Sequence, residues 1–300
     1  MELYYKLAQE KEVYNILEII KEELSGINLE AYVDNADNII VRKKGTGKKV
    51  MVSTVIKNPR LCITNIKSDN IAEVSVSEEY RSSDLCGLEA ISDKGDLGIV
   101  RCAEDVDKSS EKDVSLHIEL WDEKLANVAD ICHIKSNIYC KGDLLYGFNT
   151  SPLILTKILI DTIKQHVESV NDIYFTLSFS DFGLVSAVKK INPETLYFVY
   201  EVNADKNFKI SNGCGIVYKD GNAIVAADVI KRETEVAKNN NICVQPFVGK
   251  QNKLLETLGI TADINEICAL CVPVKHLKSN CEVIDVKDVK SVGIMLVNML

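Results

Sequence analysis

The chain lacks any hydrophobic run long enough to span a membrane, and its N-terminus lacks the apolar core of a secretion signal. No stretch of the 300 residues approaches the roughly 20 consecutive apolar residues that a membrane helix needs. Residues 1–6 read Met-Glu-Leu-Tyr-Tyr-Lys, which places charges at the start of the chain. These absences predict a cytoplasmic protein that does not enter a membrane.

Positive charge is also scarce. The sequence has 35 Lys and Arg against 44 Asp and Glu, which gives a formal net charge of −9. An acidic chain is repelled by the phosphates of nucleic acids and by anionic lipid surfaces. We therefore expect neither nucleic acid nor membrane as a partner, while the 46% hydrophobic content is enough for a sizeable core.

The ten cysteines do not form the compact framework of a small secreted domain. They are scattered from Cys62 to Cys281, and several lie in apolar runs, where a free thiol packs as a small hydrophobic group. Cys268 and Cys271 have CxxC spacing, but they lie in a predicted strand, where residues three apart point to opposite faces. This arrangement disfavours a zinc or redox site and is typical of a reducing compartment.

A buried strand at residues 49–57 organises the predicted fold. Its sequence, Lys-Val-Met-Val-Ser-Thr-Val-Ile-Lys, is typical of a strand with both faces covered. Further strands are expected at 173–179, 196–202 and 269–274, in alternation with helices, whereas residues 65–141 contain short strands separated by turns. The pattern predicts an α/β/α sandwich that is interrupted by a small β-barrel.

Four segments resemble, in the same order along the chain, the tetrahedral (TET-type) and glutamyl or deblocking aminopeptidases, a family that includes some proteins named endoglucanases. The similar segments are 33–66, 87–100, 173–202 and 272–300. The resemblance implies a peptidase-like α/β/α domain at 1–64 and 142–300, with a β-barrel lid inserted at 65–141. It also implies two divalent metal ions, metal-dependent aminopeptidase activity and assembly into homo-oligomers.

The sequence departs from this family at the metal site. In the family the buried strand ends in His-Met-Asp, whose His binds a metal, and the same positions here are Val55, Ile56 and Lys57. The Asp that bridges both metals corresponds to Tyr146, and the last His ligand corresponds to Lys278. Valine has no lone pair to offer a metal, and a phenol with an ordinary pKa of about 10 is a poor substitute for a carboxylate.

The catalytic base of the family is also replaced. Two glutamates, the general base and a ligand, correspond to Ser180 and Asp181. A serine hydroxyl cannot take a proton from water near neutral pH. A further ligand corresponds to Glu201, or to Tyr200 if the register shifts by one residue, and the family's Gly-rich substrate loop is absent at 250–256. Because Asp181 and Glu201 alone cannot hold two metal ions, no metal or other cofactor is expected.

These departures indicate a non-catalytic pseudo-peptidase, acting as a binding or structural subunit with a peptide as its candidate ligand. Two alternatives stay open. One is a hydrolase with a rebuilt, metal-independent site, for which Ser180, Asp181 and His276 have the residue types of a nucleophilic triad. The other is a metallo-aminopeptidase with atypical ligands.

The two lysines at former metal-site positions suggest how such a pocket stays neutral. Lys57 and Lys278 stand where an acid and a His are expected, while Asp181 and Glu201 remain. We expect one lysine to pair with one of these carboxylates, because unpaired buried carboxylates repel each other and raise each other's pKa. If the pair is buried, removing one partner costs about 3–5 kcal/mol.

Overall fold

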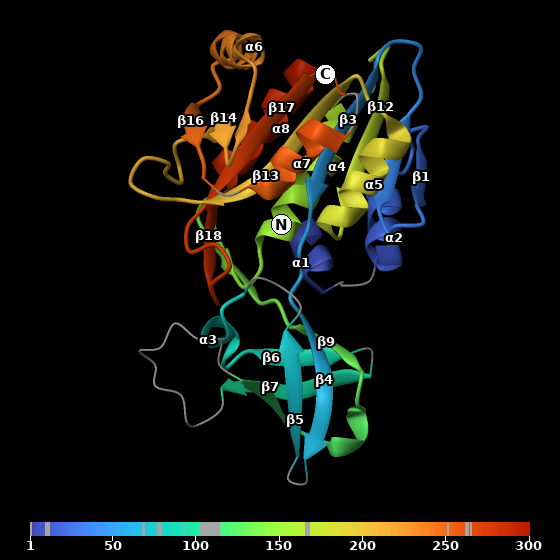
Figure 1. The fold of residues 1–300 in the computed structure, drawn as a ribbon, viewed down its shortest axis with the longest axis vertical. Coiled ribbons are helices and arrows are strands. Elements are labelled where there is room, and N and C mark those ends of the chain that lie inside the picture. The colour runs from blue at the N-terminus through green and yellow to red at the C-terminus, as the bar shows by residue number, and fades with distance from the viewer. Residues whose placement is uncertain are drawn as a thin grey trace.

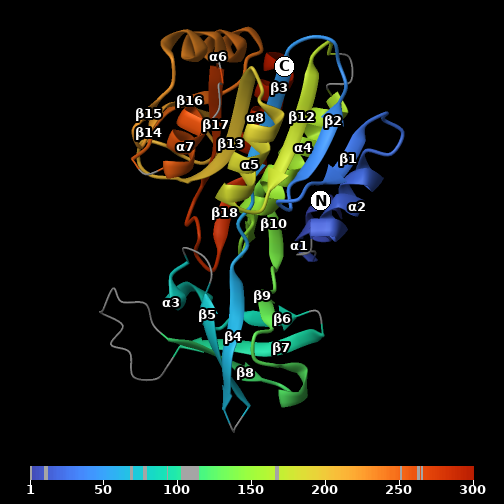
Figure 2. The ribbon, with the colours of Figure 1, turned by 45° about the vertical axis from the view of Figure 1, so that its right-hand side comes forward.

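The computed structural model describes residues 2–9, 13–67, 70–76, 80–92, 94–102, 115–165, 169–250, 252–261, 264 and 266–300. It consists of an α/β body and a β-barrel, which follow one another along the long axis of the molecule (Figure 1). Figure 2 shows the two parts from a second side, with β4 (Arg60–Lys67) and the segment that leads into β10 (Ile138–Lys141) joining them.

A nine-stranded sheet forms the centre of the body. In sheet order its strands are β1 (Glu30–Val33), β2 (Ile39–Lys43), β12 (Asp172–Ser178), β3 (Lys49–Val55), β13 (Thr195–Asn203), β17 (Glu266–Val274), β14 (Cys214–Asp220) and β15 (Ala223–Ile224), with β16 (Val244–Val248) paired to β14. β3 pairs in parallel with β12 and β13, and all its residues after Lys49 are buried. The predicted central strand is therefore confirmed.

Helices cover both faces of this sheet. One face packs against α1 (Glu2–Gln9), α2 (Val13–Glu23), α4 (Ser151–Gln165), α6 (Ala227–Asn239) and α8 (Val286–Met299), and the other against α5 (Asp181–Ile191) and α7 (Lys253–Thr261). The predicted α/β/α sandwich is confirmed, and Cys268 and Cys271 pack into opposite faces, as expected of residues three apart in a strand. None of the described helices is long and apolar enough to cross a membrane.

The predicted barrel is confirmed and has a hydrophobic core of its own. Its closed strand order is β4, β5 (Ile71–Val76), β8 (Leu116–Leu120), β7 (Gly95–Cys102), β6 (Glu89–Ser92) and β9 (Ile131–Ile134). The chain enters the barrel with β4, which begins at Arg60. After the barrel, β10 pairs with β11 (Leu144–Gly147), which pairs with β18 (Glu282–Asp285) near the C-terminus.

A small polar cluster links the barrel to the body. The Tyr80 hydroxyl donates to Asn149 Oδ1 at 2.7 Å, and Asn149 Nδ2 donates to Asn58 Oδ1 at 2.7 Å. Phe148 packs into the barrel core, with its ring 5.8 Å from that of Tyr80. The residues just before α4 are thereby tied to the barrel and to the segment that enters it.

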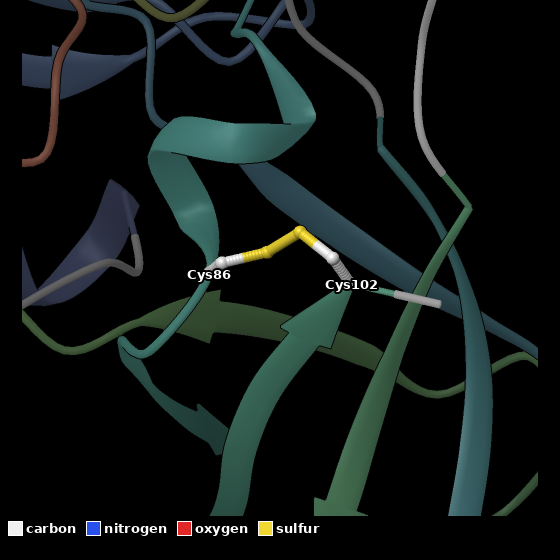
Figure 3. Close-up of a disulfide and its surroundings, with 2 residues drawn as sticks. All are labelled: Cys86 and Cys102. Atoms are coloured by element: carbon white, nitrogen blue, oxygen red, sulfur yellow. A yellow bond between two sulfur atoms is a disulfide. The ribbon is translucent and has the colours of Figure 1, made fainter. Parts of the chain in front are cut away.

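The barrel contains a disulfide that the sequence did not predict. Cys86 follows the short helix α3 (Ser82–Leu85), and Cys102 ends β7 (Figure 3). The two residues are 16 apart in sequence, and their Cα atoms are 5.9 Å apart. Spacing alone could not single out this pair among ten cysteines, since only the antiparallel barrel brings the end of α3 to the end of β7.

The body also buries one glutamate without a partner. Glu233 lies on α6 with none of its surface exposed, and neither carboxyl oxygen has a hydrogen bond among the described residues. Burial raises the pKa of Glu233 to about 8, with a smaller contribution from repulsion by Glu266, against the attraction of Arg232. The folded state therefore keeps this carboxyl protonated up to a pH at which the unfolded chain has already lost the proton.

The raised pKa of Glu233 makes the free energy of unfolding depend on pH. Below pH 4.5, the ordinary pKa, the group is protonated in both states; between 4.5 and about 8 the free energy of unfolding falls as pH rises; above about 8 the loss is complete. Glu233→Gln keeps the shape without the charge. We expect the variant to match the parent at pH 4 and to be more stable at pH 8, by on the order of 3 kcal/mol, in urea unfolding.

Glu235→Gln is the matched control, because Glu235 lies on the same helix and is exposed. Its unfolding free energy should follow that of the parent at every pH. Parallel pH profiles for Glu233→Gln and the parent would contradict the assignment.

Candidate functional site

A large pocket opens where the carboxyl ends of β3 and β13 meet the start of α5, the start of α7 and the loop after β17. Its volume is about 1070 Å³, at the upper end of pockets that hold small ligands. Carboxyl ends of parallel strands are where ligands bind in α/β sheets. Five of the residues expected at the former metal site line it: Val55, Lys57, Asp181, Glu201 and Lys278.

Lys57 forms the expected ion pair. Its ammonium lies 3.1 Å from Asp181 Oδ2, whereas Val55, two residues earlier, is buried and contributes only apolar surface. The predicted burial of this pair is wrong, since the two side chains keep 29% and 49% of their surface exposed. The reason is that Asp181 begins α5 at the rim of the pocket, where solvent screens the pair and reduces its contribution to stability.

Ser180 caps a helix. Its Oγ accepts a hydrogen bond from the Gly183 backbone amide at 3.0 Å, which satisfies one of the free donors at the start of α5. The buried amide of Asn38 donates to the Gly183 carbonyl and so ties this turn to the start of β2. Neither Ser180 nor His276 lines the pocket, so the geometry does not assemble the triad that their residue types allowed.

Glu201 lies on the pocket wall near the end of β13. Burial raises the pKa of its carboxyl to about 7, and the negative charge of Glu282 raises it further, while its own backbone amide and the charges of Lys278 and Lys57 lower it. Tyr200, the alternative register, also lines the pocket, but its hydroxyl donates to Asp220 at 2.9 Å. Glu201 is thus the carboxylate whose pKa both lysines lower.

The loop that carries Lys278 is held in an unfavourable backbone conformation. His276 and Lys278 have φ values of 59° and 63°, in the left-handed region that non-glycine residues rarely adopt. Two hydrogen bonds hold the loop in this conformation: the Leu277 amide donates to Asn203 Oδ1 at 3.1 Å, and the Lys278 amide donates to Glu282 Oε1 at 2.9 Å. Strain of this kind persists only where surrounding contacts over-determine the backbone, and it clusters at functional sites.

Glu282, which the sequence did not single out, links the loop that carries Lys278 to the start of α4. The side chain is fully buried, and Oε2 accepts from the amide and hydroxyl of Thr150 and of Ser151, at 2.7 to 3.2 Å. Its charge faces the positive N-terminal end of α4. The one signal in the sequence is a carboxylate directly before the apolar residues of β18.

Tyr146, the remaining residue expected at the former metal site, lies outside the pocket. It is on β11, opposite Tyr139 of β10 and Val283 of β18, and it does not line the pocket. The residues that lead into α4 are Asn149 and Thr150, both buried and engaged in the contacts above. Tyr146 is therefore not brought together with the other residues expected at the former metal site.

Hydrogen bonds around Asp220 and Asn252 hold another part of the pocket wall, next to residues 250–256. Asp220 accepts from the Tyr200 hydroxyl at 2.9 Å and from the Asn252 amide at 3.2 Å, and Asn252 Oδ1 in turn accepts from the Leu255 amide at the start of α7. Lys250 and Lys253 are exposed beside this turn. The rim here is cationic, with a fixed backbone beneath it.

The donor set does not fit a pair of divalent metal ions. At the inner end of the pocket two carboxylates, Asp181 and Glu201, share the space with two lysines, Lys57 and Lys278. Among the described residues no group of three His, Cys, Asp or Glu side chains converges as a metal site requires. A two-metal centre needs more carboxylate and imidazole donors than these positions provide.

The contacts of Glu282 give a direct test of the site's architecture. Glu282→Gln removes the charge and presents an amide donor to backbone or hydroxyl donors, so it should lower the free energy of unfolding by about 2–4 kcal/mol. Glu256→Gln is the control, because Glu256 is only partly buried and accepts a hydrogen bond from the Asn222 amide. Urea unfolding measures both, and equal, small losses would contradict the central role of Glu282.

No family model matches the chain. In sequence it is 24% identical over 310 residues to a protein of Acetivibrio thermocellus described as "Putative aminopeptidase", covering 95% of this chain and 92% of that protein.

Among solved structures, aminopeptidase APDkam598 of the archaeon Desulfurococcus kamchatkensis is similar with a TM-score of 0.88 and 14% identity, covering 99% of this chain and 93% of that one. The TET1 peptidase of Pyrococcus horikoshii is similar with a TM-score of 0.82 and 18% identity, covering 99% and 98%. The resemblance read from the sequence is thus confirmed, and the chain has the α/β fold of the TET-type aminopeptidases.

Proposed function

We propose that this protein is a pseudo-peptidase, which uses the pocket of an aminopeptidase fold to bind a ligand without hydrolysing it. The observation that carries the proposal is the inner wall of the pocket, where Lys57 pairs with Asp181 at 3.1 Å and Lys278 enters from a strained loop. Ammonium groups can balance the remaining carboxylates, as metal ions do in a two-metal hydrolase. They cannot replace the coordination chemistry of those ions.

The missing chemistry is the activation of water. A metal centre polarises the scissile carbonyl and lowers the pKa of a bound water molecule. Lysine side chains can attract a carbonyl oxygen, but they offer no coordination position for water. Ser180, at the place of the general base, has its hydroxyl engaged in capping α5. The pocket therefore retains binding surface without the means to cleave a peptide bond.

A second candidate function rests on Glu201. Its pKa of about 7 suits a general base or acid at neutral pH. Beside Lys57 and Lys278 it forms the kind of charged group that a metal-independent hydrolase of activated esters or amides could use. Such an enzyme would depend on Glu201 and would be indifferent to chelators.

Metal content and hydrolysis together separate these possibilities. We expect purified protein, loaded with zinc, cobalt or manganese and then desalted, to retain far less than one metal equivalent per chain by elemental analysis. Leucyl-p-nitroanilide and p-nitrophenyl acetate should be hydrolysed no faster than in buffer, because neither a metal nor a positioned base activates water.

Two retained equivalents with chelator-sensitive turnover would show a metallo-aminopeptidase and contradict the proposal. Turnover that survives chelation and is lost in Glu201→Gln would support the second candidate instead. Glu256→Gln is the control for that variant, because Glu256 lines the outer part of the same pocket.

We further propose that the protein is a cytoplasmic homo-oligomer. The Pyrococcus horikoshii TET1 peptidase assembles into a tetrahedron or a large octahedral shell. This chain exposes Ile224 and Val248, which flank Lys219 on neighbouring strands at the edge of the sheet, with 76% and 65% of their surfaces accessible. Exposed apolar side chains at a sheet edge favour association.

Light scattering coupled to gel filtration tests this assembly. At micromolar concentration the mass should be a multiple of the 33.4 kDa chain. A mass of one chain at every concentration would contradict the proposal, whatever the outcome of the metal and activity measurements.

A further inference from the structure

Helix α6 has a carboxyl group at the centre of the narrow stripe that attaches it to the sheet. Its buried residues are Val229, Glu233 and Ala237, spaced four residues apart on one side of the helix. Val229 and Ala237 belong to the hydrophobic core of the body. Glu233 between them is fully buried, and neither of its carboxyl oxygens has a hydrogen bond among the described residues. The contact surface of α6 therefore carries an ionisable group where an amphipathic helix carries an apolar one.

The rest of α6 adds little to this attachment. The helix packs against β14, β17 and α8, at the end of the body that lies farthest from the barrel (Figure 1, Figure 2). Ala226 at its N-terminal cap makes no side-chain hydrogen bond to the free amides of the first turn. Ile230 and Val236 add partly buried apolar surface, and Arg232 pairs with Glu266 of β17. Segments that are docked by few buried contacts open at a lower free energy than the core of a protein.

Two free thiols lie in the part of the core next to α6. Cys214 of β14 and Cys268 of β17 belong to the same hydrophobic cluster as the apolar residues of the stripe, and both are fully buried. Arg232 Nη2 of α6 donates to Cys268 Sγ at 3.3 Å. Burial raises the pKa of both thiols, and the negative charge of Glu233 raises it further. Because the thiolate is the reactive form, both groups are inert while α6 is in place.

The surroundings of Glu233 offer little to balance an ionised carboxylate. Arg232, its neighbour on α6, attracts the charge, but its guanidinium also pairs with Glu266, which repels Glu233. β14 and β17 otherwise place the thiols of Cys214 and Cys268 within its electrostatic reach. Tyr197 of β13 and the charged residues of α8 have other partners or face solvent: Tyr197, Lys287, Asp288 and Lys290.

Ionisation of Glu233 and docking of α6 therefore oppose each other. Burial raises the pKa of the carboxyl to about 8 while the helix is docked, whereas a carboxyl that has moved into water has its ordinary pKa near 4.5. Between these two values each pH unit makes opening about tenfold more favourable relative to docking, because the open helix has lost a proton that the docked helix retains. Above about pH 8 both forms are ionised and the effect is complete.

We propose that α6 is a pH-sensitive cover, which leaves the sheet when Glu233 ionises and so uncovers Cys214 and Cys268. The opening is local: the strands beneath α6 keep their partners in the nine-stranded sheet, and α5 and α7 stay on the opposite face. The cover gives the protein two reactive thiols that are accessible only at alkaline pH. It is independent of the proposed function of the pocket, since α6 contributes no residue to the pocket lining.

Thiol labelling of the full-length protein measures the opening directly. Iodoacetamide is added without denaturant between about pH 6 and about pH 9, and mass spectrometry of the peptides follows each cysteine separately. The rates for Cys214 and Cys268 are divided by the rates for the same thiols in Glu233→Gln, so that the pH dependence of the thiol chemistry itself cancels. We expect this ratio to rise about tenfold per pH unit and to level off above about pH 8.

Cys271 distinguishes a local opening from unfolding of the whole body. It is fully buried on the opposite face of the sheet, away from α6. At about pH 8 we expect Cys214 and Cys268 to be labelled at least about tenfold faster than Cys271. Low concentrations of urea should accelerate the labelling of Cys271 more strongly, because global unfolding exposes more surface than the release of one helix.

Two further variants check the role of the charge. Glu233→Met places an apolar side chain in the stripe and should match Glu233→Gln at every pH, even if the amide of the glutamine is poorly accommodated. Glu235→Gln removes an exposed carboxylate from the same helix and should behave as the parent. Circular dichroism and Tm confirm that each variant is folded.

The proposal is overturned if Cys214 and Cys268 are labelled at the same rate in the parent and in both Glu233 variants at about pH 8. It is also overturned if they are labelled no faster than Cys271, since Glu233 would then act only on the stability of the whole body. Failure of both thiols to react at the highest pH would have the same meaning, because α6 would then stay docked over an ionised carboxylate.

Discussion

The hydrogen bonds of the Glu282 carboxylate hold in place the loop that brings Lys278 to the pocket. One oxygen accepts four hydrogen bonds from Thr150 and Ser151 at the start of α4, and the other accepts the amide of Lys278. A buried charge is stable only when its hydrogen-bonding capacity is filled, and here the filling groups come from two distant segments. The same carboxylate thus fixes the start of α4 and the strained loop, and the loop places Lys278 in the wall of the pocket.

The positions of the charged side chains in the pocket depend on these segments. Lys278 enters from the loop that Glu282 holds, Lys57 enters from the end of β3, and both act on Glu201. The pair of Lys57 and Asp181 is half exposed, so it contributes mainly to the charge pattern that a ligand meets and little to stability. Backbone strain such as that at His276 and Lys278 clusters at functional sites.

The barrel is coupled to this site through the start of α4. Asn149 bonds to Tyr80 of the barrel and to Asn58 of the segment between β3 and β4, one residue before Thr150 meets Glu282. Movement of the barrel relative to the body would therefore disturb the residues that cap α4. The disulfide between Cys86 and Cys102 closes a neighbouring segment of the barrel, which begins six residues after Tyr80.

The sequence by itself determined the layered fold and most of the residues around the pocket. The apolar run of β3, the alternation of strands with helices and the short strands of the barrel are local patterns. The resemblance to the aminopeptidases then assigned Val55, Lys57, Asp181, Glu201 and Lys278 to one region, and all five line the pocket. Tertiary structure alone decided which of them touch. In the folded protein the pair of Lys57 and Asp181 is partly exposed, and Ser180 caps α5. Tyr146 lies on β11, Cys86 is bonded to Cys102, and Glu282 is buried at the start of α4. Each of these depends on contacts between segments far apart in the chain, and the free energy of such contacts is set by burial and hydrogen-bond geometry that no local pattern encodes.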